Sequence, residues 1–379
     1  MQQKITDEQL IAERNAGKTQ RQIAEEYGMN KRTIEGRCSA LAKKGHFHGN
    51  ENVSRHVPEG FMVKGTSTMV RANGEEVIRW VKTDQDKEKL AAMMEAAIEA
   101  FCDELPREKP HAPLVHQVKE DQLALYPVFD LHIGAMAHKH ECGENYSTDI
   151  SEKVLSDFFR YSVGVAPEAA KAVLLIGGDF LHSDGLDAVT PASGHVLDQD
   201  SRYAKLVHVA IRSVRRAVTS MLAKHREVEI QIIEGNHDQS GMIWLRAAMA
   251  AFYEDEPRVK VDVSPMVLHR TKWGKTLLGY THGHTMKKAD VRLSALATDF
   301  REEFGTSDYV YTHSGHWHHQ TITEHSLGID EVHGQLGAKD AYAARGGWRS
   351  YRQAAVIVYS KEYGEIGRFV YRPVMSKQH

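Results

Sequence analysis

The chain has 379 residues, of which 41% are hydrophobic and 26% are charged. This composition is close to the globular average and excludes collagen-like, mucin-like and wholly disordered chains, while the length predicts two or three domains. The 48 Lys and Arg residues against 51 Asp and Glu residues give a formal net charge of −3, which does not by itself indicate a nucleic-acid-binding protein.

The sequence contains no candidate membrane segment. It has no run of about 18 apolar residues, the length that a membrane-spanning helix needs. The first nine residues include Lys4, Asp7 and Glu8 but no apolar segment, so we expect no signal peptide and place the protein in the cytoplasm. The three cysteines are isolated and form no CxxC pair, which fits a reducing compartment and argues against a disulfide framework.

Residues 1–45 predict a small helical domain. Helices are expected near 7–15, 20–27 and from 31 onward, with turns at Gly17 and Gly28. Two short helices joined by a tight glycine turn are typical of a helix-turn-helix, whose second helix presents its first residues to the major groove. The expected DNA-binding residues are Lys31, Arg32, Thr33 and Arg37. The alternative is a helical bundle used for packing or dimerisation.

Residues 46–120 predict a connecting region. Strands at 61–71 and 75–83 flank an Asn73-Gly74 turn and indicate a hairpin. Apolar residues at helical spacing from Leu90 to Leu105 predict a helix, and the prolines that follow indicate a linker. We therefore place the last domain at residues 121–379.

From residue 121, short apolar strands alternate with helices, which predicts a layered α/β domain. Strands are expected at 123–129, 172–176, 228–233, 276–280, 309–311 and 354–359. Helices are expected at 151–161, 203–224, 243–253 and 291–304. Each of the first five strands runs directly into a polar cluster. Because ligand sites in α/β sheets form at the carboxyl ends of strands, we expect these five clusters to converge.

The five clusters offer nitrogen and oxygen donors and no thiolate. In chain order they are Asp130-Leu131-His132, Gly178-Asp179, Gly235-Asn236-His237-Asp238, His282-Gly283-His284 and Gly315-His316-Trp317-His318. This donor set suits Mn, Fe, Zn or Ni. Seven or eight donors are too many for one ion and appropriate for two, so the pattern predicts a two-metal site.

These five blocks, in this order, resemble the calcineurin-like metallophosphoesterases, whose pattern is DxH, GDxx, GNHD/E, a strand-end His and GHxH. The resemblance covers about residues 121–373. It implies a fold of two β-sheets packed as a sandwich and flanked by helices. It also implies two divalent metal ions as cofactors, with Mn expected and Fe, Zn and Ni as alternatives.

The resemblance also implies a role for each motif residue. One metal would be held by Asp130, His132, Asp179 and His318, and the second by Asp179, Asn236, His282 and His316. His237 matches the family's catalytic histidine, which is not a ligand, binds the substrate phosphate and can protonate the leaving oxygen.

Two details of the motifs refine this resemblance. The third residue after the Gly178-Asp179 pair is His182, where many phosphatases of the family have Asp. A histidine there resembles the DNA-repair nuclease branch and makes His182 a second catalytic candidate. The departure from the pattern is Pro127, because a proline removes a hydrogen-bond donor from a central strand.

The expected function is therefore a metal-dependent DNA nuclease, acting as an exonuclease or an endonuclease and held on DNA by its helix-turn-helix. The order of domains looks similar to phosphoesterases of bacteriophages and prophages, which would place it in a host cytoplasm. One alternative is a phosphodiesterase or phosphatase acting on small nucleotides or phosphoproteins. Another is a DNA-binding regulator with an inactive phosphoesterase domain. DNA is the expected partner, a membrane is not, and homo-oligomer formation is left open.

Residues outside the five blocks have simpler interpretations. The surplus histidines, His284, His313, His319, His325 and His333, are expected to support ligands, face substrate or lie exposed. The basic and aromatic segment at 342–352 could guide a single strand past the metals or simply lead into the next strand.

Overall fold

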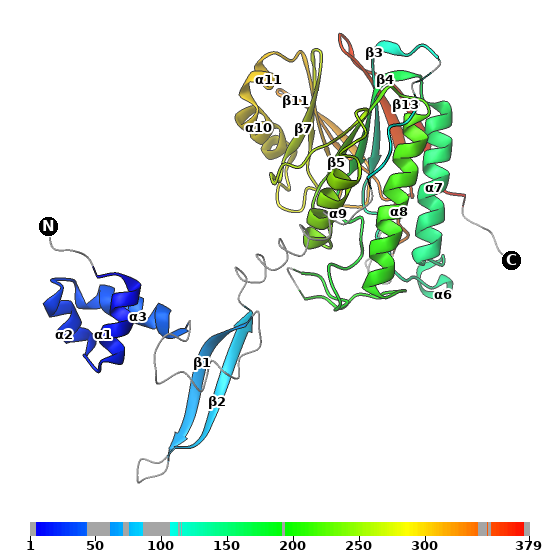
Figure 1. Cartoon of the computed structure of the whole chain (residues 1–379). Coiled ribbons are helices and arrows are strands. Elements are labelled where there is room, and N and C mark those ends of the chain that lie inside the picture. The colour runs from blue at the N-terminus through cyan, green and yellow to red at the C-terminus, as the bar shows by residue number, and fades with distance from the viewer. Residues whose placement is uncertain are drawn as a thin grey trace. The chain divides into compact units, whose positions relative to one another are not determined.

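The computed structural model describes residues 5–43, 61–70, 76–85, 107–112, 114, 116–191, 194–339, 347 and 350–374. The chain forms two compact units, Met1–Ala97 and Ile98–His379 (Figure 1). The helix predicted at 90–105, the Asn73-Gly74 turn and most of the 342–352 segment lie outside the described residues. In the described part of the chain, no helix is both long and apolar enough to cross a membrane.

The first unit contains the three predicted helices: α1 (Asp7–Asn15), α2 (Gln20–Glu26) and α3 (Lys31–Lys43). Thr6 and Thr19 begin α1 and α2 with capping boxes, in which the threonine side chain and a glutamine three residues later satisfy free backbone N–H groups. The helices bury Leu10, Ile23 and Ile34 between them. β1 (Phe61–Val70) and β2 (Glu76–Gln85) pair in antiparallel orientation, as the predicted hairpin requires.

In the second unit, the strands that the structure describes form two sheets. The six-stranded sheet has the order β13-β12-β3-β4-β5-β6, and the five-stranded sheet has the order β10-β11-β9-β8-β7. The strands of the first are β3 (Lys119–Val128), β4 (Ala169–Ile176), β5 (Glu227–Ile232), β6 (Val259–Val261), β12 (Ala354–Ser360) and β13 (Gly364–Tyr371). Those of the second are β7 (His269–Trp273), β8 (Thr276–Tyr280), β9 (Tyr309–Ser314), β10 (Thr321–His325) and β11 (Gly328–Val332).

The two sheets share one hydrophobic core. Leu125 and Val173 from the six-stranded sheet pack in the same cluster as Leu278 and Tyr311 from the five-stranded sheet. The strands that carry these residues, β3, β4, β8 and β9, lie inside their sheets rather than at the edges. This shared core therefore keeps in place the strands that lead into the predicted polar clusters.

Helices cover the outer faces of this sandwich (Figure 1). α7 (Thr148–Val165), α8 (Tyr203–Leu222) and α9 (Gln239–Phe252) contact the six-stranded sheet, and α10 (Ala289–Asp299) contacts β9 and β11. The predicted fold of two sheets flanked by helices is confirmed. The single helix predicted at 291–304 is wrong: Phe300, with φ −123° and ψ 52°, separates α10 from α11 (Arg301–Gly305).

Pro127 is accommodated within β3. It lies opposite Leu175 in the parallel pairing with β4. On the other side, β12 pairs with β3 only as far as Leu125, so the proline removes no donor from that ladder. The strand therefore continues past the proline to Val128, two residues before Asp130.

Candidate metal centre

The five predicted clusters all follow strands at their carboxyl ends. β3, β4 and β5 are parallel neighbours in one sheet, and β8 and β9 are parallel neighbours in the other. Their carboxyl ends deliver Asp130, Asp179, Asn236, His282 and His316 to the loops between the sheets. The convergence expected from the strand pattern is therefore present in the fold.

One group of donors consists of Asp130, His132 and His318, with one ligand atom from each within 4.8 Å of the others. His318 Nε2 lies 3.3 Å from Asp130 Oδ1 and 3.4 Å from His132 Nε2. The other carboxylate oxygen of Asp130 accepts a hydrogen bond of 2.9 Å from the backbone amide of His316. One oxygen of Asp130 is thus engaged by the loop, while the other faces two imidazoles.

The second group consists of Asp179, His282 and His316, again within 4.8 Å of one another. His282 Nε2 lies 3.2 Å from Asp179 Oδ2 and 4.0 Å from Asp130 Oδ1, so the two groups adjoin. His282 Nδ1 donates a hydrogen bond of 2.9 Å to the carbonyl of Gly177, which directs its Nε2 toward the carboxylates.

Several buried polar atoms of the predicted ligands have no hydrogen-bond partner among the described residues, and Asn236 Oδ1 and His316 Nδ1 are two of them. Leaving such an atom unsatisfied costs about 1–3 kcal/mol. Both belong to residues that the family resemblance assigns to the same metal. A divalent cation that accepts oxygen and nitrogen donors would satisfy both atoms, so the donor set fits the implied cofactor.

The backbone supports the same grouping. Among the described residues, five residues other than glycine adopt positive φ, between 49° and 75°. They are Asp130, His132, Asp179, His316 and His318. All five are predicted ligands, and each left-handed residue costs about 1–2 kcal/mol. Strain of this kind concentrates at functional sites, where the surrounding structure holds it in place.

Two glycines allow the loops to approach one another. A Cβ atom on Gly235 would lie 2.1 Å from Asp179 Oδ1. Gly178 has φ +91°, and a Cβ there would lie 2.6 Å from His282 Nδ1. The glycines that precede Asn236 and Asp179 in the motifs are therefore required by close packing as well as by the turn.

Asp238 has a role that sequence reasoning missed. Its Oδ1 accepts hydrogen bonds from the backbone amides of Asp179 and Gly235, at 3.1 and 3.0 Å. Its Oδ2 accepts bonds from the amides of Phe180 and Leu181, at 2.6 and 3.0 Å. This fully buried carboxylate fastens the loop after β4 to the loop after β5. Its position beside His237 in the third block was the available signal.

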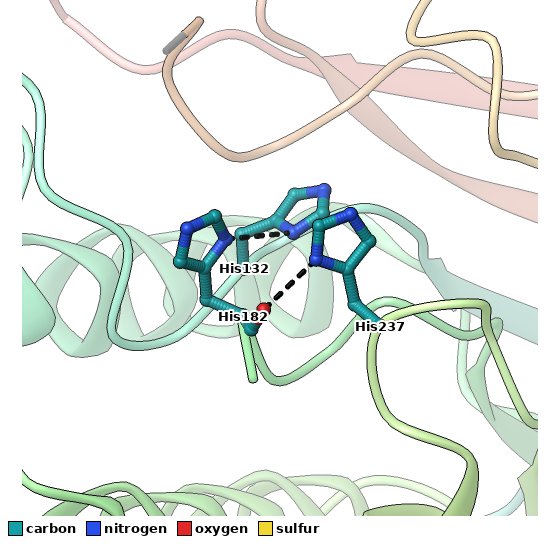
Figure 2. Close-up of side chains that lie close together, drawn as sticks. All are labelled: His132, His182 and His237. Atoms are coloured by element: carbon teal, nitrogen blue, oxygen red, sulfur yellow. Dashed lines mark hydrogen bonds between the residues drawn. The ribbon is translucent and has the colours of Figure 1, made fainter. Parts of the chain in front are cut away.

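His132, His182 and His237 form a third cluster (Figure 2). His237 Nδ1 donates a hydrogen bond of 2.8 Å to the backbone carbonyl of His182, which leaves Nε2 as the nitrogen available to a substrate. His182 Nδ1 lies 3.4 Å from His132 Nδ1, and its side chain is buried. The structure therefore places His182 against the far nitrogen of a predicted ligand.

Burial and charge set the protonation of these rings. Burial lowers the pKa of His132, and it lowers the pKa of His316 to about 4, so both rings are neutral at pH 7. Burial also opposes the charged form of His282, but the Asp179 carboxylate outweighs it and raises the pKa of His282 to about 10. Conversely, His282 holds the pKa of Asp179 well below its usual value despite burial. The centre thus combines the neutral imidazoles of His132 and His316 with a protonated His282 that is paired with the ionised Asp179 carboxylate.

A fourth group, His313, Glu331 and His333, lies in the protein interior. His313 Nδ1 and His333 Nε2 are hydrogen-bonded at 2.9 Å, and His313 Nε2 is 3.1 Å from the hydroxyl of Tyr359. Arg368 donates to both oxygens of Glu331, at 2.5 and 2.8 Å. The guanidinium already neutralises this carboxylate, so the group is a satisfied polar network rather than a cation site.

The predicted DNA-binding residues differ in their contacts. Arg32 and Thr33 are exposed at the start of α3. Lys31 Nζ lies 3.3 Å from Glu35 on the same helix. Arg37 donates hydrogen bonds to the Asp7 carboxylate and, at 2.9 Å, to the carbonyl of Ile5. Arg37 therefore fastens α3 to the start of α1.

Comparison of the sequence with family models and with curated proteins found no match. Among solved structures, the chain is similar to a predicted phosphoesterase from Streptococcus pneumoniae, at 11% identity over 68% of this chain and 100% of that one, with a TM-score of 0.27. It is also similar to a dimetal phosphatase from Danio rerio, at 10% identity over 66% and 98% of the two chains, with a TM-score of 0.33. An archaeal phosphodiesterase matches at 10% identity over 66% and 99%, with a TM-score of 0.30. Similarity at this level does not assign a function, which therefore depends on the geometry of the site.

Proposed function

We propose that this chain is a two-metal phosphoesterase that hydrolyses phosphodiester bonds, and that its substrate is DNA. The observation that carries the proposal is that the two donor groups adjoin, since His282 of the second group lies 4.0 Å from Asp130 of the first. His237, which belongs to neither of these two groups, forms a cluster with His132 of the first. Nitrogen and carboxylate donors in two such groups are the arrangement used by two-metal hydrolases.

Each group would hold one cation. Asp130, His132 and His318 would hold the first, and His282, His316 and Asn236 would hold the second, with Asp179 between them. Two divalent cations there would supply a water nucleophile at neutral pH and would neutralise the charge of the phosphate. Mn is the proposed metal, and Fe, Zn and Ni suit the same donors.

His237 would bind the phosphate and protonate the leaving oxygen. Its Nδ1 is held by the carbonyl of His182, so its ring has one orientation and its Nε2 is the atom that can carry the transferred proton. His182 would act differently from the catalytic role that the sequence suggested. Because it is buried against His132, it would orient that ligand rather than touch the substrate.

The first unit supports DNA as the substrate. α2 and α3 follow one another across a short turn that contains Gly28, and this order of elements is the one expected of a helix-turn-helix. Arg32 and Thr33 are exposed at the beginning of α3, the part of a recognition helix that contacts base edges. We therefore propose that this unit binds DNA and holds the phosphoesterase unit on its substrate.

The net charge of −3 favours a second candidate, hydrolysis of a small phosphodiester or nucleotide. A protein that acts along a polyanion usually presents a cationic surface, and an acidic chain gains no electrostatic attraction from its total charge. This candidate keeps the same metals and the same role for His237, and it assigns the first unit to packing or oligomerisation.

Hydrolysis assays separate the two candidates. Labelled single- and double-stranded DNA and the small ester bis(p-nitrophenyl) phosphate should be incubated with the full chain, with Mn²⁺ or with a chelator. Cleavage of DNA that requires the metal supports the nuclease. Cleavage of the small ester alone favours the second candidate, and cleavage of neither contradicts the phosphoesterase assignment.

A further inference from the structure

Trp317 lies between two residues that belong to different donor groups. His316 belongs to the group with Asp179 and His282, whereas His318 belongs to the group with Asp130 and His132. The backbone is left-handed on both sides of the tryptophan, with φ 75° at His316 and 57° at His318. Without these two unfavourable conformations, the side chains of His316 and His318 would point in other directions. Contacts with the surrounding structure must therefore hold this segment in place.

The tryptophan ring is confined by a segment that carries another ligand. A Cβ atom on Gly283, the residue after His282, would lie 2.7 Å from Cζ3 of the ring. Any side chain at 283 would displace the indole. The ring also lies 5.3 Å, centroid to centroid, from the imidazole of His316. Trp317 thus touches the loop after β8 as well as the loop after β9 that carries it.

Arg292 fixes another side of the ring. The centre of its guanidinium lies 5.3 Å from the ring centroid, within the range of a cation–π interaction. Arg292 is only 2% exposed, and it donates bonds of 2.8 and 2.6 Å to the Asp330 carboxylate and one of 2.7 Å to the carbonyl of Met286. Because Asp330 lies in β11, the cation that faces the indole is anchored in the five-stranded sheet.

We propose that Trp317 is a positioning residue that holds His316 and His318 in place and thereby maintains both metal sites together. This inference rests on the proposed function, because it requires that both donor groups bind metal. Without the indole, the segment between the two histidines loses its packing against Gly283 and Arg292, and its left-handed residues relax toward ordinary conformations. One substitution therefore weakens two sites, whereas loss of a ligand that belongs to one group acts mainly on that group.

Calorimetric titration of the full chain with Mn²⁺ tests this inference. The variants are Trp317→Ala, Trp317→Phe and the control Trp273→Ala. Trp273 is a matched control because it also packs against a cation, with Lys361 Nζ 4.5 Å from its ring, and its Nε1 bonds the carbonyl of Asp121. We expect Trp317→Ala to weaken both Mn²⁺ sites by about 10- to 100-fold, the effect of losing outer support of ligands. Trp317→Phe should weaken both by a smaller factor, and Trp273→Ala should bind like the wild type.

The outcomes separate this inference from the proposed function. Two Mn²⁺ sites in the wild type with unchanged affinities in Trp317→Ala, or with only one affinity lowered, would overturn the role of Trp317. Fewer than two sites in the wild type would instead overturn the two-metal proposal. Thermal unfolding shows whether Trp317→Ala is folded. If Trp317→Ala is not folded, the Mn²⁺ titration of Trp317→Phe is the test. Wild-type affinities at both sites in Trp317→Phe would contradict the inference.

Discussion

The backbone amide of His237 donates a hydrogen bond of 2.8 Å to Asp179 Oδ1. This bond joins the loop after β5 to the Asp179 carboxylate, which belongs to the second donor group. It uses only the main chain of residue 237, so it persists whatever the side chain is. The contribution of the His237 imidazole to the reaction can therefore be separated from its backbone contribution to the site.

We expect His237→Ala to bind two metal ions like the wild type but to lose hydrolysis. The imidazole is the proposed proton donor, and loss of a general acid typically lowers the rate by about 10²–10⁴-fold. The measurement is steady-state hydrolysis beside Mn²⁺ titration of the same sample. Parallel loss of metal and activity would show that His237 supports the site rather than the chemistry.

Asp179→Asn should remove metal binding as well as activity. The neutral amide cannot supply the charge that two adjacent cations share, and it also loses the attraction to His282 across 3.2 Å. Mn²⁺ affinity should fall by at least about 100-fold. Asp187→Asn is the matched control, since Asp187 is exposed in the loop beyond His182. Wild-type affinity in Asp179→Asn would exclude Asp179 as a bridging ligand.

Asp238→Asn tests the carboxylate that fastens the two loops. The Asp238 carboxylate accepts hydrogen bonds from four backbone N–H groups. The side-chain NH₂ group of an asparagine at this position would face two of these N–H groups and could not accept from them. We expect the free energy of unfolding to fall by about 2–4 kcal/mol, the cost of leaving such groups buried and unsatisfied. Urea unfolding of apo protein measures this cost, and an unchanged midpoint would refute it. Asp149→Asn, at an exposed ion pair, should change the midpoint little.

In Glu331→Gln, the free energy of unfolding should depend less on pH in the acidic range than it does in the wild type. Burial opposes ionisation of Glu331, but His333 and Arg368 outweigh it and lower its pKa from 4.5 to about 2. A carboxyl group whose pKa is lower in the folded state than in the unfolded state stabilises the folded state. This stabilisation is complete above the ordinary pKa and is lost as the pH falls from about 4.5 toward 2. At pH 7 the variant should be less stable by about 3 kcal/mol, because Arg368 loses a buried partner.

The pH series supplies the decisive comparison for Glu331. The difference in unfolding free energy between wild type and Glu331→Gln should narrow as the pH is lowered from about 6 to about 3. Glu302→Gln is the control, because Glu302 is exposed on α11. A difference that stays constant over this range would mean that the pKa of Glu331 is not lowered in the folded protein.

The first unit provides a contrast between two arginines. Arg32→Ala should weaken DNA binding and reduce its dependence on salt by about one counterion, because an exposed arginine at the start of α3 is placed to contact DNA. Arg37→Ala should instead destabilise the three helices, because Arg37 holds Asp7 and Ile5. Fluorescence anisotropy with DNA and thermal unfolding distinguish these effects. Equal DNA affinities for Arg32→Ala and wild type would contradict the proposed role of α3.

Local patterns in the sequence predicted the main features of the site. An apolar strand followed at once by Asp, Asn or His is a short-range signal, and it located Asp130, Asp179 and His282 before the strands were paired. A glycine directly before such a residue was an equally local signal, and it predicted the turn at Gly178. The two-sheet arrangement came with the family resemblance and is confirmed by the order of the strands.

Features that depend on contacts between distant segments could not be predicted in this way. The role of Asp238 requires the loop after β4 to lie against the loop after β5. The burial of His313 and His333 requires Arg368 from a strand near the end of the chain to pair with Glu331. β10 was not predicted, because it is exposed at a sheet edge and has no apolar alternation to mark it.

Anomalous X-ray scattering from crystals of the full chain grown with Mn²⁺ tests the central claim most directly. We expect two peaks about 3.5–4 Å apart. One should contact Asp130, His132 and His318, the other should contact Asn236, His282 and His316, and Asp179 should lie between them. A single peak, no peak, or a peak at His313, Glu331 and His333 would contradict the two-metal centre.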